Sequence, residues 1–251
     1  DGKIKFGQFY DRGIPAGVAE DPENFPRLIA AYKKAGGDKS RTLRAGDLIE
    51  LKKTSGPELR LICLMASGET ILTEGEFQKN ELCDSATNKP EDTSENGQSI
   101  VLLLSYGDFD FYNGGDLTWN FEKQLVCPYN RVGQVELFQV CHHGLDLSNN
   151  PVLVHSIRPK TAIMCNGPRK GGDPEVLKTL RTSPGLGDLW ALHRNVRLSD
   201  SDNPPKERVA NWSNPEGGEF ILVRVAPDGK SYTVQIGANG EPVQYGTWPT
   251  R

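Results

Sequence analysis

Two adjacent histidines carry the clearest chemical signal in the sequence. His142 and His143 stand in QVELFQVCHHGLDLS, directly after an apolar run and before a glycine, and the chain contains only four histidines. Asp116 lies in a similar place, because it follows an apolar run and two glycines in YNGGDLTW. Histidine nitrogens and carboxylate oxygens are common ligands of first-row divalent metals. These residue types in these places predict a metal-ligand site.

Each of these residues also has a purely structural interpretation. His142 and His143 could be one core and one surface histidine. Asp116 could cap a helix that begins at Leu117 or Thr118, which stabilises a helix by about 1 kcal/mol. Capping and metal binding are compatible at one carboxylate. The metal-ligand interpretation is favoured because both motifs follow predicted strands of the same sheet.

The predicted elements place both motifs where buried strands end. A hairpin turns at Gly107 and Asp108 within 99–117, and helices alternate with strands from there to residue 193. The expected helices are 118–126, 150–157 and 173–183, and the expected strands are 134–141, 160–166 and 188–193. Such alternation predicts an α/β fold. In such sheets, ligands gather at the ends of the strands.

The remaining segments extend this core on both sides. The spacing of apolar residues predicts a helix within 21–37, strands at 47–51 and 58–67, and polar loops at 81–98 and 194–217. A second hairpin is expected at 219–237. Residues 1–251 are therefore expected to form a single domain, with its core at 47–193.

The order of these elements resembles the metallo-β-lactamase superfamily. The resemblance is strongest to soluble hydrolase domains of the ComEC type, named after a bacterial DNA-uptake protein. The matching stretches are ENGQSIVLLLSYGDFDFYNGGDLTW, VELFQVCHHGLDLSNNPVLVHSIRPKTAIMCNGPRKGG and PEVLKTLRTSPGLGDLWALH, within 95–193. The resemblance implies a metallo-β-lactamase-like αββα sandwich with mixed sheets and a C-terminal β-hairpin.

The same resemblance implies roles for individual residues. Asp116 matches the carboxylate that bridges two metals. The histidine pair supplies a late ligand, with His143 favoured over His142 because it directly precedes the glycine. Asn96 and Ser99 fall where ComEC-type members carry an Asn-x-x-Ser-like segment in place of a histidine ligand. The residues expected to contact substrate are Asn166, Arg169, Lys170, His193 and Asn96.

Alternatives remain open for several of these residues. GPRKGG, residues 167–172, could bind a phosphate through Arg169, Lys170 and backbone amides, or it could be a polar turn. His193 could face the site or pack in the core. Cys141, beside the histidine pair, is more typical of a small buried residue than of a thiolate nucleophile.

One departure from the family is large. The superfamily's His-x-His-x-Asp-His segment supplies most of the metal ligands, and this sequence does not contain it. In related sequences that segment lies just upstream of a stretch like GQFYDRG, so the N-terminal part of the fold is expected to be incomplete. One carboxylate and one histidine are fewer than the about three protein ligands of a zinc site. The intact family holds two divalent ions, such as zinc, and this chain by itself could hold none.

The resemblance implies a metal-dependent hydrolase. A metal-bound hydroxide would attack a phosphodiester or another ester, with Asp116 and His143 as catalytic residues and a small molecule or nucleotide as substrate. One alternative is a metal-free remnant that acts as a scaffold, or one piece of a split hydrolase completed by an N-terminal segment of the same polypeptide. Another is an acyl hydrolase of the lactamase or lactonase type.

Composition narrows the possible partners and location. A net charge of −4 gives no strong footprint for non-specific nucleic-acid binding. No apolar run approaches the ~18 residues of a membrane helix. The five cysteines include no C-x-x-C pair, which argues against a structural zinc site. Cys83 and Cys127 could pair in an exported protein, and the family's habits favour a bacterial, secreted or periplasmic location.

Overall fold

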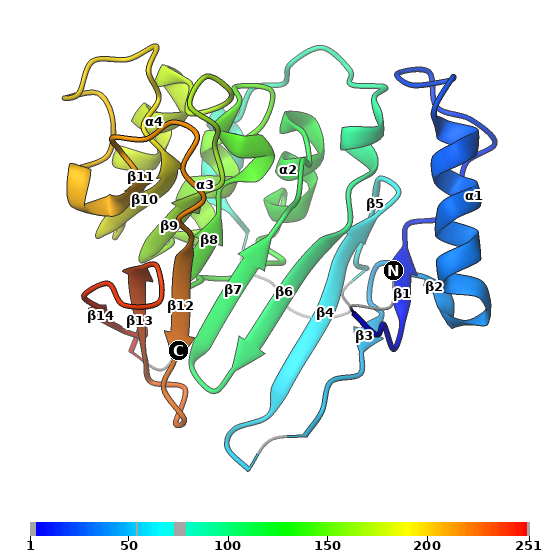
Figure 1. The fold of residues 1–251 in the computed structure, drawn as a ribbon, viewed down its shortest axis with the longest axis horizontal. Coiled ribbons are helices and arrows are strands. Elements are labelled where there is room, and N and C mark those ends of the chain that lie inside the picture. Colours follow the sequence, from blue (N-terminus) through cyan, green and yellow to red (C-terminus); the bar gives the residue numbers. More distant parts are fainter. Residues whose placement is uncertain (1–3, 54, 73–78, 250–251) are drawn as a thin grey trace.

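The computed structural model describes residues 4–53, 55–72 and 79–249 (Figure 1). Its centre is a nine-stranded mixed sheet in the order β11-β10-β9-β8-β7-β6-β4-β3, with β5 paired to β4. The strands are β3 Leu48–Ile49, β4 Leu59–Ala66, β5 Glu69–Thr70, β6 Val101–Tyr106, β7 Phe109–Asn113, β8 Leu137–Gln139, β9 Thr161–Met164, β10 Asp188–His193 and β11 Val209–Asn211.

Strand direction divides this sheet into two halves. Strands β7 to β11 are parallel to one another. Strands β6, β4 and β3 follow as antiparallel neighbours. The carboxyl ends of β7, β8, β9 and β10 therefore lie at one edge of the sheet, beside the start of β6. This edge is where the sequence places Asp116 and the two histidines.

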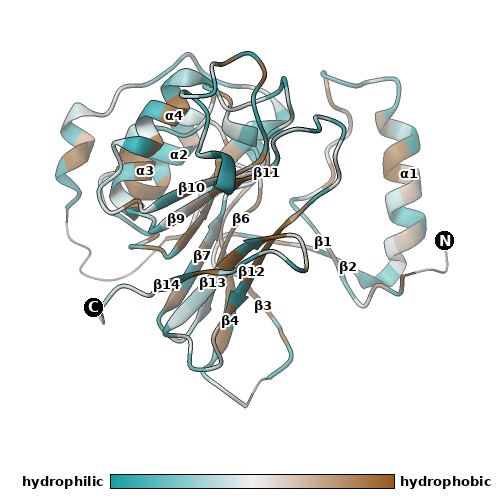
Figure 2. Ribbon diagram, turned by 60° about the vertical axis from the view of Figure 1, so that its left-hand side comes forward, coloured by the Kyte–Doolittle hydropathy of each residue, from teal (hydrophilic) through white to brown (hydrophobic). Residues whose placement is uncertain are grey.

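Separate layers cover the two faces of the sheet, as Figures 1 and 2 show. On one face lie α2 Trp119–Val126, α3 Pro151–Ile157 and α4 Pro174–Arg181. On the other lies an antiparallel sheet of β12 Ile221–Val225, β13 Ser231–Ile236 and β14 Val243–Gly246. Alternate residues of each strand serve the two layers: Phe138 belongs to the helix-side core, whereas Leu137 packs with Tyr232. The expected α/β sandwich is confirmed, with one large mixed sheet and a smaller antiparallel one.

The N-terminal segment forms a smaller unit at the side of the main sheet. Strands β1 Phe9–Asp11 and β2 Ser40–Thr42 pair in parallel, and α1 Phe25–Gly36 connects them. Figure 1 shows α1 apart from the other three helices. Within this unit, the Tyr32 hydroxyl of α1 donates a hydrogen bond to the Asp11 carboxylate at 2.7 Å.

Several elements differ from the sequence expectation. The loop at 194–217 contains β11 and a 3₁₀ helix at Lys206–Arg208, and the C-terminal hairpin gains β14 as a third strand. Strands β1 and β2 were not expected either. Each of these strands has only three or four residues, too few to show a hydrophobic period. Pairing with a neighbouring strand, and not local sequence, therefore defines them.

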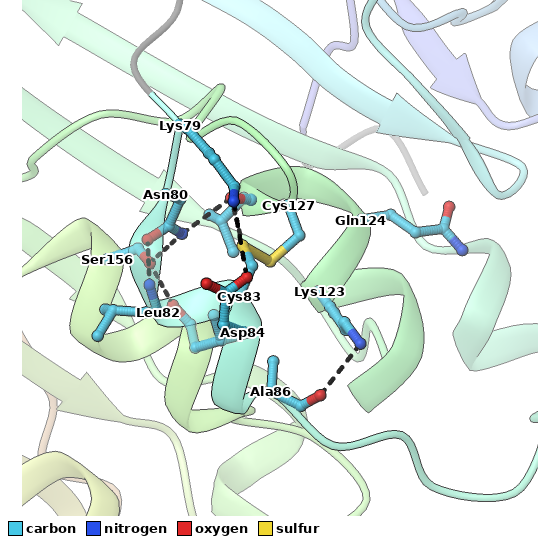
Figure 3. Close-up of a disulfide and its surroundings, with 12 residues drawn as sticks. Lys79, Asn80, Leu82, Cys83, Asp84, Ala86, Lys123, Gln124, Cys127 and Ser156 are labelled. Atoms are coloured by element: carbon cyan, nitrogen blue, oxygen red, sulfur yellow. Dashed lines mark hydrogen bonds and ion pairs between the residues drawn. A yellow bond between two sulfur atoms is a disulfide. The ribbon is translucent and has the colours of Figure 1, made fainter.

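A disulfide ties the polar segment 81–98 to the helical layer. Cys83, in the 3₁₀ helix Glu81–Ser85, bonds to Cys127 at the end of α2, across a sequence separation of 44 residues (Figure 3). The segment ends in another 3₁₀ helix, Glu95–Gln98, directly before β6. Lys123 of α2 adds a hydrogen bond to the carbonyl of Ala86 at 3.2 Å. The start of the segment is thus fastened to α2.

Removing the disulfide should destabilise the fold. We expect the Cys83→Ala, Cys127→Ala double variant to lose about 2–4 kcal/mol of unfolding free energy, because the cross-link restricts the unfolded chain. Urea unfolding with and without dithiothreitol measures this. Reduction should weaken the wild-type protein to the level of the double variant and leave the double variant unchanged. Equal stability of oxidised and reduced wild-type protein would contradict the prediction.

Candidate metal and substrate site

Asp116 and His143 meet at the carboxyl edge of the sheet. Their nearest atoms, Asp116 Oδ1 and His143 Nε2, lie 3.8 Å apart, and both side chains are partly exposed. His143 Nδ1 lies 2.9 Å from the carbonyl oxygen of Cys165. A carbonyl only accepts, so Nδ1 donates this hydrogen bond, and Nε2 is the ring nitrogen that faces Asp116. This backbone contact is the kind that orients metal-ligating histidines.

His142 has a different environment from its neighbour. It is buried, with Nδ1 3.2 Å from the Ser148 hydroxyl and Nε2 3.5 Å from the Asn96 amide nitrogen. Burial lowers the pKa of His142; Asp116 opposes this effect, while His143 and Lys170 reinforce it. Asn96 therefore lies beside His142, whereas His143 is the histidine beside Asp116.

An unusual backbone presents the two histidines. They form part of a 3₁₀ turn, Cys141–Gly144, in which His142 and His143 have φ of 51° and 58°. Such left-handed conformations cost about 1–3 kcal/mol each for non-glycine residues and persist only where the surroundings enforce them. The His142 amide donates to the carbonyl of Gly115 at 3.0 Å. That bond joins this turn to the glycine before Asp116.

A buried amide and a buried acid hold this turn from behind. Asn149 accepts from the Cys141 amide and donates to the Cys141 carbonyl, both at 3.0 Å, and donates to the Leu145 carbonyl at 3.2 Å. The Glu122 carboxylate of α2 in turn accepts the backbone amides of Asn149 at 2.8 Å and Asn150 at 2.7 Å. Burial raises the pKa of Glu122 to about 7, against the opposing effect of these hydrogen bonds.

Sequence reasoning did not identify Glu122 or Asn149. The signal for Glu122 was an acidic residue one turn before Leu125 and Val126, on the face of α2 that becomes buried. The signal for Asn149 was its pairing with Asn150 before a helix. Asn150 caps α3 by accepting from the Val152 amide at 3.0 Å. Asn149, its neighbour, holds the histidine turn instead.

The glycines of GPRKGG pack against the same turn. The Gly172 amide donates to the His143 carbonyl at 3.1 Å, and the Asp173 amide donates to the Gly144 carbonyl at 2.9 Å. Gly171 has φ of 77°, and a Cβ there would collide with the His143 carbonyl. These glycines support the histidine turn, while the exposed side chains of Arg169 and Lys170 stand at its rim.

The other predicted substrate contacts are placed as follows. Asn166 is buried, and its amide both donates to the His193 carbonyl at 2.8 Å and accepts the His193 amide at 3.2 Å. It thus joins the ends of β9 and β10. His193 is partly buried at the end of β10. Their contact with substrate stays a prediction.

The donors of the site are too few for a complete metal centre. Across residues 4–53, 55–72 and 79–249, no group of three or more histidine, cysteine, aspartate or glutamate side chains is arranged to hold an ion. Asp116 and His143 converge as two ligands would, but a zinc site uses about three protein ligands. The described residues fit one side of such a centre and do not complete it.

Comparison with known proteins gives one distant similarity. No model of a known protein family matches the chain. The chain is similar to ComE operon protein 3 of Bacillus subtilis (strain 168), with 23% identity over 154 residues, which cover 61% of this chain and 16% of that protein. The similarity therefore concerns a small part of a much longer protein, and it gives weak support to a ComEC-like relationship.

The buried Glu122 should make stability depend on pH. Its folded pKa of about 7 exceeds its ordinary value of 4.5, so the folded state keeps a proton that the unfolded state releases. Stability from this group is complete below about pH 4.5 and is lost as pH rises towards 7, by at most about 1.4 kcal/mol per pH unit.

Urea unfolding of Glu122→Gln across this pH range tests the effect. The variant should be less stable than the wild type at acid pH, because an amide cannot accept from both backbone donors, and the difference should shrink towards neutral pH. Glu175→Gln, at an exposed position of α4, serves as the matched control and should follow the wild type. If the difference in unfolding free energy between the wild type and Glu122→Gln stays constant with pH, the raised pKa of Glu122 is refuted.

Proposed function

We propose that this chain contributes Asp116 and His143 to the metal centre of a phosphodiester hydrolase. The observation that carries the proposal is the 3.8 Å approach of Asp116 Oδ1 to His143 Nε2, together with the Cys165 carbonyl that fixes the imidazole tautomer. Two ligands that share a cation would need this arrangement. The phosphodiester is inferred from the resemblance to ComEC-type hydrolase domains, which the distant similarity to ComE operon protein 3 supports.

The proposal requires ligands beyond those described. Divalent ions in hydrolases lower the pKa of a bound water and supply hydroxide, but two protein donors do not hold such an ion firmly. The remaining ligands would come from another segment of the polypeptide or from a partner. The chain is therefore proposed as one part of the hydrolytic site.

The chain's own basic residues suit an anionic substrate. Arg169 and Lys170 stand exposed at the turn that follows β9, and the charge of Lys170 acts on His142. Guanidinium and ammonium groups bind phosphate oxygens through charge-assisted hydrogen bonds. The positive rim beside Asp116 and His143 would thus attract a phosphodiester, and it would do less for a neutral lactam or lactone.

The proposed location is outside the cytoplasm of a bacterium. The Cys83–Cys127 disulfide supports this, because disulfides persist mainly in oxidising compartments. In the described part of the chain, no helix has the length and apolar character to cross a membrane.

A metal-free binding module is the second candidate function. The observation in its favour is the same shortage of donors among the described residues. In that case, the Asp116–His143 pair would be an ordinary charge contact at a protein or ligand surface. Metal titration separates the two functions.

Titration with Mn²⁺ and Zn²⁺ should detect weak binding at the Asp116–His143 pair. Isothermal calorimetry of chelator-treated protein should show about one ion per chain. Asp116→Ala and His143→Ala should each weaken metal binding by more than about tenfold. Each variant removes a metal ligand, and losing a contact that only orients a ligand already costs about 10–100-fold in affinity.

His155→Ala is the matched histidine control. His155 Nε2 contacts the Thr179 carbonyl at 3.0 Å between α3 and α4, so its loss should leave metal affinity unchanged. Should the protein bind an ion and Asp116→Ala and His143→Ala bind it as tightly as the wild type, the pair holds no metal, the hydrolase proposal fails and the metal-free module remains.

A further inference from the structure

The loop after β10 grips the glycine pair Gly171–Gly172 from the side opposite to the histidine turn. The side chain of Asn195, which is buried, donates to the Gly171 carbonyl at 3.0 Å and to the Gly172 carbonyl at 3.1 Å. One side-chain amide thus takes up both carbonyls of the glycine pair. Sequence reasoning did not identify Asn195.

The glycine pair is bonded to the histidine turn on its other side. The Gly172 amide donates to the His143 carbonyl at 3.1 Å, and the next amide, of Asp173, donates to the Gly144 carbonyl at 2.9 Å. Gly171 lies so close to the turn that a Cβ there would collide with the His143 carbonyl. A shift of the glycine pair would therefore pass directly to His143.

Arg197 adds to this grip from the surface. Its guanidinium donates to the Gly171 carbonyl and to the Asp173 carboxylate, both at 2.9 Å. Asp173 in turn accepts the Asp146 amide at 3.1 Å, just after the histidine turn. The Arg197 side chain is 47% exposed, so water competes for its hydrogen bonds. Asn195 is the buried member of the grip, and its bonds have no such competition.

Another asparagine fixes Asn195 itself and repeats the contacts of Asn149. The Asn203 side chain accepts the Asn195 amide at 2.7 Å, and it donates to the carbonyls of Asn195 at 3.1 Å and Ser199 at 2.9 Å. Asn149 makes the same three kinds of bond around the histidine turn. In both cases the partners lie eight and four residues before the asparagine. The loops on the two sides of the glycine pair are therefore closed in the same way.

We propose that Asn195 is a positioning residue for His143: it holds the glycine pair against the histidine turn and so keeps Nε2 directed at Asp116. Two contacts then define the imidazole, the Cys165 carbonyl on Nδ1 at 2.9 Å and the glycine pair on the backbone. Without the second contact, the costly φ of 58° at His143 would relax, and Nδ1 would leave the Cys165 carbonyl. The inference rests on the proposed function, in which His143 binds metal, but the positioning itself needs no ion.

Asn211 offers a matched control for Asn195. It is also buried, and its side chain donates to the carbonyls of Leu192 and Glu219, both at 2.9 Å, and accepts the Glu219 amide at 3.0 Å. Asn195 likewise donates to two backbone carbonyls and accepts one backbone amide, that of Arg197. The bonds of Asn211 join β10 to the segment before β12, and none of them reaches the glycine pair.

Nitrogen NMR of the histidine rings in metal-free protein tests the inference, at a pH well above the ordinary histidine pKa. In the wild type, the proton of the neutral His143 ring should reside on Nδ1, which donates to the Cys165 carbonyl. Asn195→Ala should shift the His143 signals towards a mixture of both tautomers, whereas Asn211→Ala should leave them unchanged. His143→Ala identifies the signals.

Calorimetric titration with Mn²⁺ gives a second measurement. Asn195→Ala should weaken metal binding by about tenfold, the lower end of the cost of losing a contact that orients a metal ligand, and Asn211→Ala should bind like the wild type. Urea unfolding should show a similar loss of stability in both variants, because both lose the same kinds of hydrogen bond. A metal effect confined to Asn195→Ala then does not come from stability. Asn203→Ala, one bond further from the turn, replaces Asn195→Ala if that variant does not fold.

Wild-type ring signals in Asn195→Ala, or equal changes in Asn195→Ala and Asn211→Ala, would overturn the inference. Where an ion binds, an unchanged affinity in Asn195→Ala would overturn it as well. The ring signals decide the role of Asn195 even without an ion, whereas Asp116→Ala and His143→Ala decide the metal proposal. The two proposals therefore fail separately.

Discussion

The hydrogen bonds from Glu122 through Asn149 to Cys141 are the constraint on which the site depends. Two consecutive histidines with positive φ are costly, and a free chain would not adopt this turn. The Asn149 amide closes it at Cys141, and Glu122 holds the Asn149 backbone from within the core. Because Glu122 is buried and ionisable, this support is itself sensitive to pH. The chemistry at the surface therefore rests on an ionisable group in the interior.

The parallel strands provide the second requirement of the site. Because β7, β8 and β9 run in one direction, residues that leave their carboxyl ends meet although they are far apart in sequence. Asp116, His143 and Lys170 reach the same edge in this way. Antiparallel β6 begins at this edge, which brings Asn96 beside His142. The segment before β6 and the start of α2 line a cavity to which Asn96 also contributes.

Charge and cross-linking give the edge two distinct sides. Arg169 and Lys170 form an exposed basic rim beside the GPRKGG glycines, whereas the segment before β6 carries the Asp92 carboxylate and Asn96. The Cys83–Cys127 disulfide fastens that segment to the end of α2.

The sequence by itself determined the α/β class, the parallel core and the meeting of Asp116 with the histidines, because these follow from hydrophobic period, turn residues and strand order. It also indicated the 219–237 hairpin. Only the tertiary structure decided which histidine faces Asp116, since His142 and His143 differ through contacts with Asn96, Ser148 and Cys165, distant along the chain or on other elements. The Glu122 clamp, the three-residue strands and the disulfide partner of Cys83 were decided in the same way. They depend on long-range packing, and no local pattern encodes it.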